Sequence, residues 1–128
     1  MPLVRISALP QPGGVEPERA LAAVTHALAD LLGEEPSGSW ATWEEIQPGR
    51  YVEGGDAPAL QPAATHPRLV EVVAFEGRPA DFVERVPTTV ATVLERELGL
   101  ERGNVFVRYV EASGGRLYTG GSVVRRQR

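Results

Sequence analysis

An internal repeat constrains the fold of this chain more than any other feature of its sequence. When the 128-residue sequence is shifted against itself by 66 positions, fifteen residues of the segment 2–55 are identical to their counterparts in 68–121 without a gap. Glycines at helix ends and turns are among them, so a duplicated structural unit explains the matches better than chance does. Within a single domain over residues 1–128, we assign the copies to 2–55 and 68–121 and an Ala- and Pro-rich linker to 56–67. The matches include Leu3 with Leu69, Val24 with Val90, Gly33 with Gly99, Glu45 with Glu111, and Gly55 with Gly121.

Each copy has the periodicity of a strand, a helix and a second strand. The predicted elements are strands at 3–9 and 69–75, helices at 16–32 and 80–98, and strands at 39–46 and 104–111. Pro87 falls inside the second helix and should kink it or delay its start, because its nitrogen cannot donate a hydrogen bond. Right-handed crossovers make the strands of each unit parallel. The sequence therefore predicts an α/β (α+β) fold of two fused β-α-β units, with a four-stranded mixed sheet and two helices on one face.

The strands predict two sheet faces of different character. One face presents a set of small apolar residues to the helices: Val4, Ile6, Ala8, Val70, Val72 and Ala74. The other face carries Trp40, Phe75 and Phe106, which the two helices cannot reach. A partly apolar second face needs another layer, and self-association is the simplest way to supply it.

Composition excludes several classes of function. A net charge of −4 and a pI near 5.2 argue against a nucleic-acid surface. The chain has no cysteine and only two histidines, which argues against disulfides and against a zinc site. No apolar run reaches the ~18 residues of a membrane-spanning helix, and no signal peptide is recognisable. We expect a cytoplasmic protein that needs no metal and binds neither nucleic acid nor membrane.

Pro2 is the residue with the clearest chemical meaning. If Met1 is removed, Pro2 carries a free secondary amine at the start of a strand, where it is a candidate general base. If Met1 is retained, the Pro2 nitrogen is an amide and this chemistry is impossible. Under the 66-residue shift Pro2 matches Arg68, and Arg78 matches the uncharged Pro12. Each half therefore keeps only one of the two features that could form a site.

These features resemble the tautomerase superfamily, and in particular its 4-oxalocrotonate tautomerase group. The second copy resembles that family's short subunit, with a strand ending in Glu76-Gly77-Arg78, a helix, a strand ending in Glu111 and a hairpin ending in Gly120-Gly121. The first copy supplies the amino-terminal proline, so the resemblance covers essentially the whole chain. Longer fused members, such as cis-3-chloroacrylic acid dehalogenase, malonate semialdehyde decarboxylase and macrophage migration inhibitory factor, are trimers. The resemblance implies a tautomerase-like fold of that kind and a homotrimer with three competent sites.

The resemblance also implies roles for individual residues. Arg78 occupies the family's carboxylate-binding position, although a solvated turn residue is the alternative. A further family arginine corresponds here to Phe106, which leaves Arg108, two residues along on the same strand face, as a second substrate contact. The alternative for Arg108 is an ion pair with a neighbouring subunit's glutamate. Candidates for the aromatic or apolar pocket wall are Trp40, Tyr51, Phe106, Leu117 and Tyr118.

The sequence and the resemblance together predict a tautomerase-type isomerase acting on a small 2-keto or enol carboxylic acid. Pro2 would move the proton, the arginines would hold the carboxylate and stabilise the dienolate, and no cofactor or metal would be needed. One alternative is a hydratase or decarboxylase of an unsaturated or 3-oxo acid, with cationic Pro2 as the acid. Another is a non-catalytic trimer in which Met1 is retained.

Overall fold

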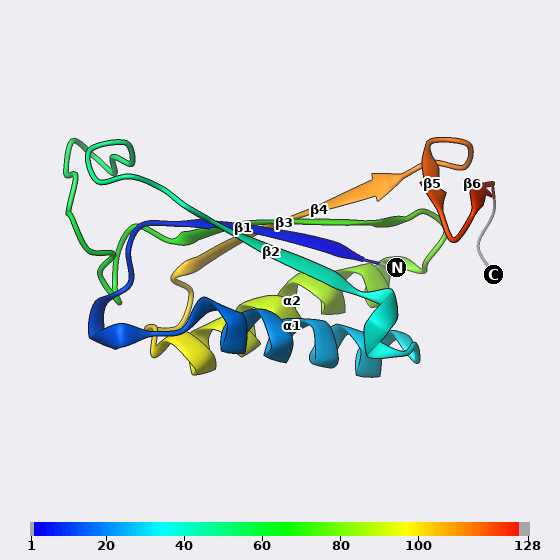
Figure 1. The fold of residues 1–128 in the computed structure, drawn as a ribbon, viewed down its shortest axis with the longest axis horizontal. Coiled ribbons are helices and arrows are strands. Elements are labelled where there is room, and N and C mark those ends of the chain that lie inside the picture. The colour runs from blue at the N-terminus through cyan, green and yellow to red at the C-terminus, as the bar shows by residue number, and fades with distance from the viewer. Residues whose placement is uncertain (1, 126–128) are drawn as a thin grey trace.

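The computed structural model describes residues 2–125 and contains both predicted β-α-β units (Figure 1). The first unit consists of β1 (Leu3–Ala8), α1 (Pro17–Leu32) and β2 (Trp40–Glu45). The second consists of β3 (Arg68–Phe75), α2 (Ala80–Leu98) and β4 (Val105–Ala112). The remaining elements are the short 3-10 helices η1 (Pro12–Gly14) and η2 (Pro36–Gly38) and a hairpin of β5 (Leu117–Thr119) and β6 (Ser122–Val124).

The strand order β2-β1-β3-β4 confirms the predicted four-stranded mixed sheet. β1 is parallel to β2, and β3 is parallel to β4, whereas the central pair β1 and β3 is antiparallel. In that central pair, Val4 lies opposite Val72 and Arg5 lies opposite Glu71. Because of this arrangement, β1 and β2 begin at the same end of the sheet where β3 and β4 finish. The residue before β1 and the turn after β3 are thereby brought to one end of the molecule.

Both helices cover a single face of the sheet, as Figure 1 shows. The strand residues predicted to face them are buried, with Val4 and Val72 fully inaccessible to solvent. The helices contribute an apolar stripe that includes Val24 and Leu28 of α1 and Leu94 of α2. Burying a Val or Leu side chain stabilises a fold by about 1.5–3 kcal/mol. This shared core therefore fixes both helices against the two central strands.

The repeated glycines end the helices. Gly33 and Gly99 follow α1 and α2 with φ angles of 68° and 65°, a left-handed conformation that costs residues with a β-carbon more than it costs glycine. The helix α2 begins at Ala80, so the expectation that Pro87 would delay its start is wrong. The proline removes the one backbone donor that would bond to Val83, and the helix continues through it.

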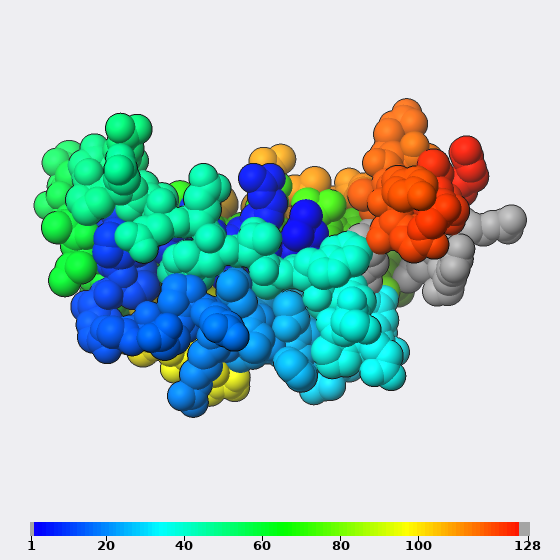
Figure 2. Space-filling model, viewed as in Figure 1, coloured from blue at the N-terminus to red at the C-terminus, as the bar shows by residue number. Residues whose placement is uncertain are grey.

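The second sheet face has no helix over it (Figure 1). Trp40 is 44% exposed and Phe106 is 58% exposed on this face, which we call the open face. The loop after β2 and the region of β5 and β6 project past the open face at opposite ends of the molecule (Figure 2). The predicted apolar residues of this face are therefore accessible within a single chain.

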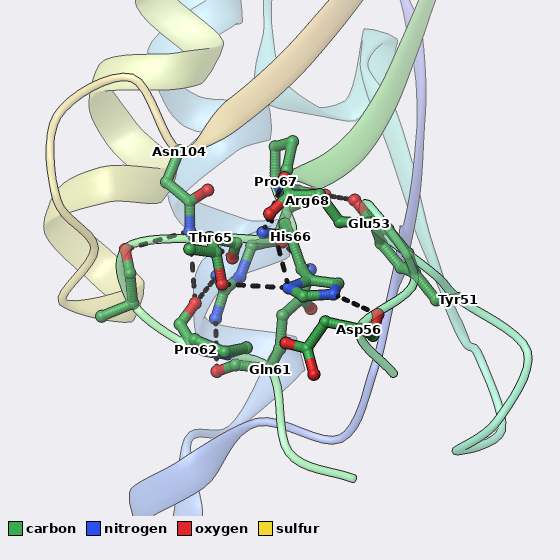
Figure 3. Close-up of polar contacts among 11 residues, drawn as sticks. Tyr51, Glu53, Asp56, Gln61, Pro62, Thr65, His66, Pro67, Arg68 and Asn104 are labelled. Carbon is green, nitrogen blue, oxygen red and sulfur yellow. Dashed lines mark hydrogen bonds and ion pairs between the residues drawn. The ribbon is translucent and has the colours of Figure 1, made fainter. Parts of the chain in front are cut away.

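The linker packs as an ordered loop at the end of the sheet where β1 finishes and β3 begins (Figure 3). Gln61 and His66 are 0% and 1% exposed. The Asn104 side-chain amide, just before β4, lies within hydrogen-bond distance of three linker carbonyls, those of Pro62, Ala63 and Thr65. The linker thus closes this end of the sheet.

Arg68 lies beneath the linker and is 1% exposed (Figure 3). Its guanidinium donates to the Gln11 side-chain oxygen at 2.6 and 3.1 Å and to the Pro62 carbonyl at 2.7 Å. A longer bond of 3.4 Å reaches the Gln61 carbonyl. Burial lowers the pKa of Arg68 to about 10, so it remains a cation at neutral pH, bonded to uncharged oxygens.

Candidate active site

Pro2 and Arg78 lie at the same end of the sheet, which we call the proline end. Pro2 is buried, and its carbonyl accepts a hydrogen bond of 3.1 Å from the backbone N–H of Trp40. This bond extends the parallel pairing of β1 with β2 by one residue and fixes the direction in which the chain enters the sheet. Arg78 follows β3 in the turn that leads to α2. The two residues that the sequence halves keep separately are therefore combined at one end.

The Arg78 side chain is held on two sides. Its Nη2 lies 3.5 Å from a carboxylate oxygen of Glu34, which follows the end of α1. Its guanidinium carbon lies 5.0 Å from the centre of the Phe82 ring, a cation–π distance. The Arg78 side chain is 21% exposed, so it is a partly buried and paired cation that keeps some access to solvent.

Two buried hydroxyl groups accompany Pro2 and Arg78. Tyr109 lies on β4 opposite Val72, on the helix-covered face, and Ser39 immediately precedes β2. Among residues 2–125, neither hydroxyl has a hydrogen-bond partner. Burial, and secondarily the Glu111 carboxylate, raises the pKa of Tyr109, and the Arg78 guanidinium acts in the opposite direction.

Neither of these hydroxyls is among the site residues predicted from the sequence. Tyr109 could have been recognised by its strand position, because it follows the core-facing Val105 and Val107 at a spacing of two residues and therefore lies on the same face. A polar tip among core-facing residues is unusual unless it has a partner. Ser39 carries no comparable signal, since a serine before a strand is common. Glu34 and Phe82 are also not among the predicted residues: Glu34 reaches Arg78 only through the packing of the two helices, whereas Phe82 lies four residues after Arg78 in the first turn of α2.

Arg108 lies on the open face and not beside Pro2. It shares that face with Phe106, as predicted, and its guanidinium lies 3.8 Å from a carboxylate oxygen of Glu71. A shallow depression of about 340 Å³ surrounds the pair. Its lining also includes Arg5, Ser7 and Leu69. Within one chain the structure therefore separates Arg108 from Pro2 by the thickness of the sheet.

The predicted wall residues fall into three places. Trp40 begins β2, and Leu117 and Tyr118 lie on β5 at the proline end, where Tyr118 is 72% exposed. Phe106 belongs to the depression on the open face. Tyr51 lies at the opposite end, where its hydroxyl donates to the Pro67 carbonyl at 2.6 Å and its ring meets His66 edge-on. One chain therefore does not bring Tyr51 to Pro2.

The groups at the proline end are suited to an anionic organic molecule. Arg78 offers a partly exposed guanidinium near Tyr109, and Ser39 lies beside Pro2; neither hydroxyl has a partner among residues 2–125. Within residues 2–125, no three His, Cys, Asp or Glu side chains are grouped so that they could hold a metal ion. The same residues include no helix that is both long and apolar enough to cross a membrane.

The fold is that of the tautomerase superfamily. Native fused 4-OT matches with a TM-score of 0.82 and 14% identity over 96% of each chain. Pt0534 inactivated by 2-oxo-3-pentynoate matches with a TM-score of 0.81 and 17% identity, over 96% of this chain and 95% of that one. A macrophage migration inhibitory factor-like protein from Entamoeba histolytica matches with a TM-score of 0.69 and 15% identity, over 95% of this chain and 97% of that one. No family model and no curated protein sequence matches the chain.

Proposed function

We propose that this protein is a tautomerase-type isomerase that moves a proton within a small 2-keto or enol carboxylic acid. The observation that carries the proposal is the meeting of Pro2 and Arg78 at one end of a tautomerase fold. A candidate base and a candidate carboxylate receptor come from different halves of the duplicated chain and lie within one end of the sheet. The fused 4-OT and macrophage migration inhibitory factor-like neighbours are consistent with this activity.

In the proposed reaction the Pro2 nitrogen accepts the proton of the enol hydroxyl and returns it to carbon, which yields the keto acid. Arg78 binds the carboxylate through its guanidinium and stabilises the negative charge of the intermediate dienolate. Burial and a neighbouring cation both favour an uncharged amine, so the Pro2 site suits a base at neutral pH. A Pro2 pKa well below the ~7.7 of an ordinary terminal amine is expected, whereas a value near or above ~9 would favour the acid role in a hydratase or decarboxylase.

The proposal requires the removal of Met1, which lies outside the described residues. A small residue after the initiator permits removal, and only then does the Pro2 nitrogen have a basic lone pair. The mass of the intact, natively expressed protein decides this point. A mass that includes Met1 would favour the non-catalytic alternative.

The composition makes a chemical test of Pro2 unusually selective. The chain contains neither lysine nor cysteine, so the terminal amine is its one amine nucleophile. Pt0534 is inactivated by 2-oxo-3-pentynoate. We propose that the Pro2 nitrogen adds to C4 of this reagent, the alkyne carbon β to the C2 ketone. A C–N bond forms, the proton moves to the adjacent carbon, and no group leaves.

The labelling experiment compares the mature protein with a form that carries an uncleaved residue before Pro2. In the mature protein we expect the mass to rise by one whole reagent per chain, the label to map to Pro2, and tautomerase activity to disappear in parallel. The extended form keeps an ordinary α-amine on the added residue, so it should be labelled much more slowly, and at that residue and not at Pro2. Labelling of both forms at the same rate would remove Pro2 from the mechanism.

We further propose that three copies assemble through their open faces. The apolar exposure of Trp40 and Phe106 supports a covered face, and fused 4-OT neighbours occur as trimers. Such an assembly would also give Arg108 a route to a site on a neighbouring subunit. Sedimentation at micromolar protein concentration tests it, and a monomer would contradict both the assembly and the shared site.

A further inference from the structure

The two hydroxyls without partners at the proline end require an explanation. A buried hydroxyl that makes no hydrogen bond loses its bonds to water and gains nothing in exchange. Native proteins tolerate few such groups. Here the Tyr109 hydroxyl and the Ser39 hydroxyl are both inaccessible to solvent and without a partner among residues 2–125.

Tyr109 lies on the helix-covered face of β4, within electrostatic range of Arg78. Its strand position is opposite Val72, and Val72 is opposite Val4 of β1, so Tyr109 shares the helix-covered face with Val4, two residues after Pro2. The Arg78 guanidinium is close enough to act on the phenol electrostatically. Because burial keeps the phenol protonated, the group is a hydrogen-bond donor at neutral pH.

Ser39 approaches from the other side of Pro2. The next residue, Trp40, donates its backbone N–H to the Pro2 carbonyl, and Leu3 pairs with Trp40 in the parallel register. One step back in that register, Ser39 lies beside Pro2. Ser39 is 6% exposed, so its hydroxyl is enclosed next to the proposed base.

We propose that Tyr109 and Ser39 are substrate-contacting residues: the Tyr109 hydroxyl binds the oxygen on C2 of the keto or enol acid, and the Ser39 hydroxyl binds a second polar atom of the substrate beside Pro2. The inference rests on the proposed function and names the groups that select its substrate. With the carboxylate on Arg78, the C2 oxygen is the next polar atom of the substrate, and Tyr109 donates to it as it becomes an enolate. Ser39, just before β2, is separated from Tyr109 by β3 and β1, and it contacts the part of the substrate that lies next to Pro2. The site thereby discriminates against carboxylic acids that lack an oxygen on C2.

Tyr109→Phe tests the inference because it removes only the phenol oxygen. We expect kcat toward phenylenolpyruvate to fall about 10²-fold, the usual cost of losing one donor to an oxyanion. The thermal midpoint of the ligand-free protein should stay the same or rise, because a buried group without a partner has been deleted. Ser39→Ala should show the same combination with a smaller loss of activity.

Tyr51→Phe is the matched control for stability. It makes the same chemical change at the opposite end of the sheet, where the hydroxyl has a partner at 2.6 Å, so its thermal midpoint should fall. If Tyr109→Phe also lowers the midpoint, or weakens the assembly in sedimentation, its hydroxyl already has a partner in the protein and the inference is wrong. Unchanged kcat in both Tyr109→Phe and Ser39→Ala is equally contrary to it.

The wild-type measurements separate this inference from the proposed function. Wild-type turnover of phenylenolpyruvate with unchanged kinetics in the two hydroxyl variants would leave the tautomerase proposal standing and overturn the inference alone. An inactive wild-type protein with Met1 removed would overturn both.

Discussion

The Arg78 guanidinium lies 3.5 Å from the Glu34 carboxylate, and this contact joins the turn after β3 to the residue that follows the end of α1. The two halves of the duplicated chain therefore meet at the proposed substrate carboxylate site. A guanidinium has five N–H donors in a planar fork, so one edge can face Glu34 while another receives a substrate carboxylate. With the Phe82 ring on its face, Arg78 is oriented before any ligand arrives.

Arg78→Ala should raise KM for a 2-keto acid strongly and lower kcat less, because carboxylate binding is largely equal in the ground state and the transition state. A charge-assisted hydrogen bond contributes about 1.5–3 kcal/mol, which corresponds to a KM increase of roughly 10- to 150-fold. Arg78→Lys keeps the charge but loses the planar fork, so its KM should lie between those of the wild type and Arg78→Ala. Steady-state kinetics measure the effect, and an unchanged KM would show that Arg78 serves only the turn.

Mixing two inactive variants tests whether Arg108 acts in a neighbouring subunit. Pro2 and Arg108 lie on opposite sides of the sheet, so a site that uses both must take them from different chains. Arg108→Ala and a chain blocked by an extension before Pro2 should each be weakly active. After co-refolding at equal amounts, about a quarter of the sites would contain an intact Pro2 and an intact Arg108.

The matched control mixes each variant with itself. Recovery of activity only in the heterologous mixture supports a shared site. No recovery, together with full activity of Arg108→Ala alone, would leave Arg108 as the ion-pair partner of Glu71 and nothing more.

Arg68→Met should destabilise the protein although Arg68 lies far from Pro2. The substitution removes a buried charge, but it leaves the Gln11 side-chain oxygen and the Pro62 carbonyl without their donor. Each stranded acceptor costs about 1–3 kcal/mol. Urea unfolding at one fixed protein concentration measures the loss, because the stability of an assembly depends on concentration. Arg19→Met, whose side chain is 84% exposed, is the control and should change the midpoint little.

Two tyrosines should contribute a decline in stability in alkali, whereas Arg68, whose pKa is lowered to about 10, contributes in the opposite direction above that pH. Burial is the largest cause of the raised pKa of both Tyr51 and Tyr109 relative to the ordinary value of 10.0. The folded protein then holds the phenol protons more tightly than the unfolded chain does. This contribution is complete below about pH 10 and is lost as the pH rises through the native pKa values.

Chemical unfolding between about pH 8 and pH 11, with phenolate absorbance recorded in parallel, checks this expectation. Tyr109→Phe should make the decline shallower. Tyr118→Phe, which alters a ring that is 72% exposed, should leave the slope as it is in the wild type. Because Arg68 contributes equally to both proteins, equal slopes for the wild type and Tyr109→Phe would contradict the expectation.

The fold could be predicted from the sequence because the periodic information is strong and occurs twice. Residues such as Val4 and Val70 mark the same face of equivalent strands, and Gly33 and Gly99 mark equivalent helix ends. The expectation that Pro87 would delay the start of α2 is wrong because the surrounding residues, among them the buried Val86 and Val90, hold the helix against the core although one backbone donor is missing.

Candidate site residues could be proposed from the sequence only where a single residue carries the chemical meaning, and their roles stay predictions. The sequence indicates Pro2 and Arg78, and the antiparallel pairing of β1 with β3 brings them to one end. The pairing of Glu34 with Arg78 depends on how two helices pack, which no local pattern encodes. Tyr51 was a candidate wall residue by position in the repeat, but its hydroxyl binds the linker, whose packing has no counterpart in the other half.

The burial of Arg68 affects whether the two halves of this protein could exist as separate chains. Arg68 stands 66 residues after Pro2, at the place where a second proline would begin an independent subunit. Cutting the chain there would put a charged amine beside a guanidinium in a dry pocket, and it would release the loop whose carbonyls now satisfy that guanidinium. The halves can no longer separate into two working peptides by loss of the covalent join alone. Two separate working peptides would therefore require the replacement of Arg68 as well as a cut in the chain.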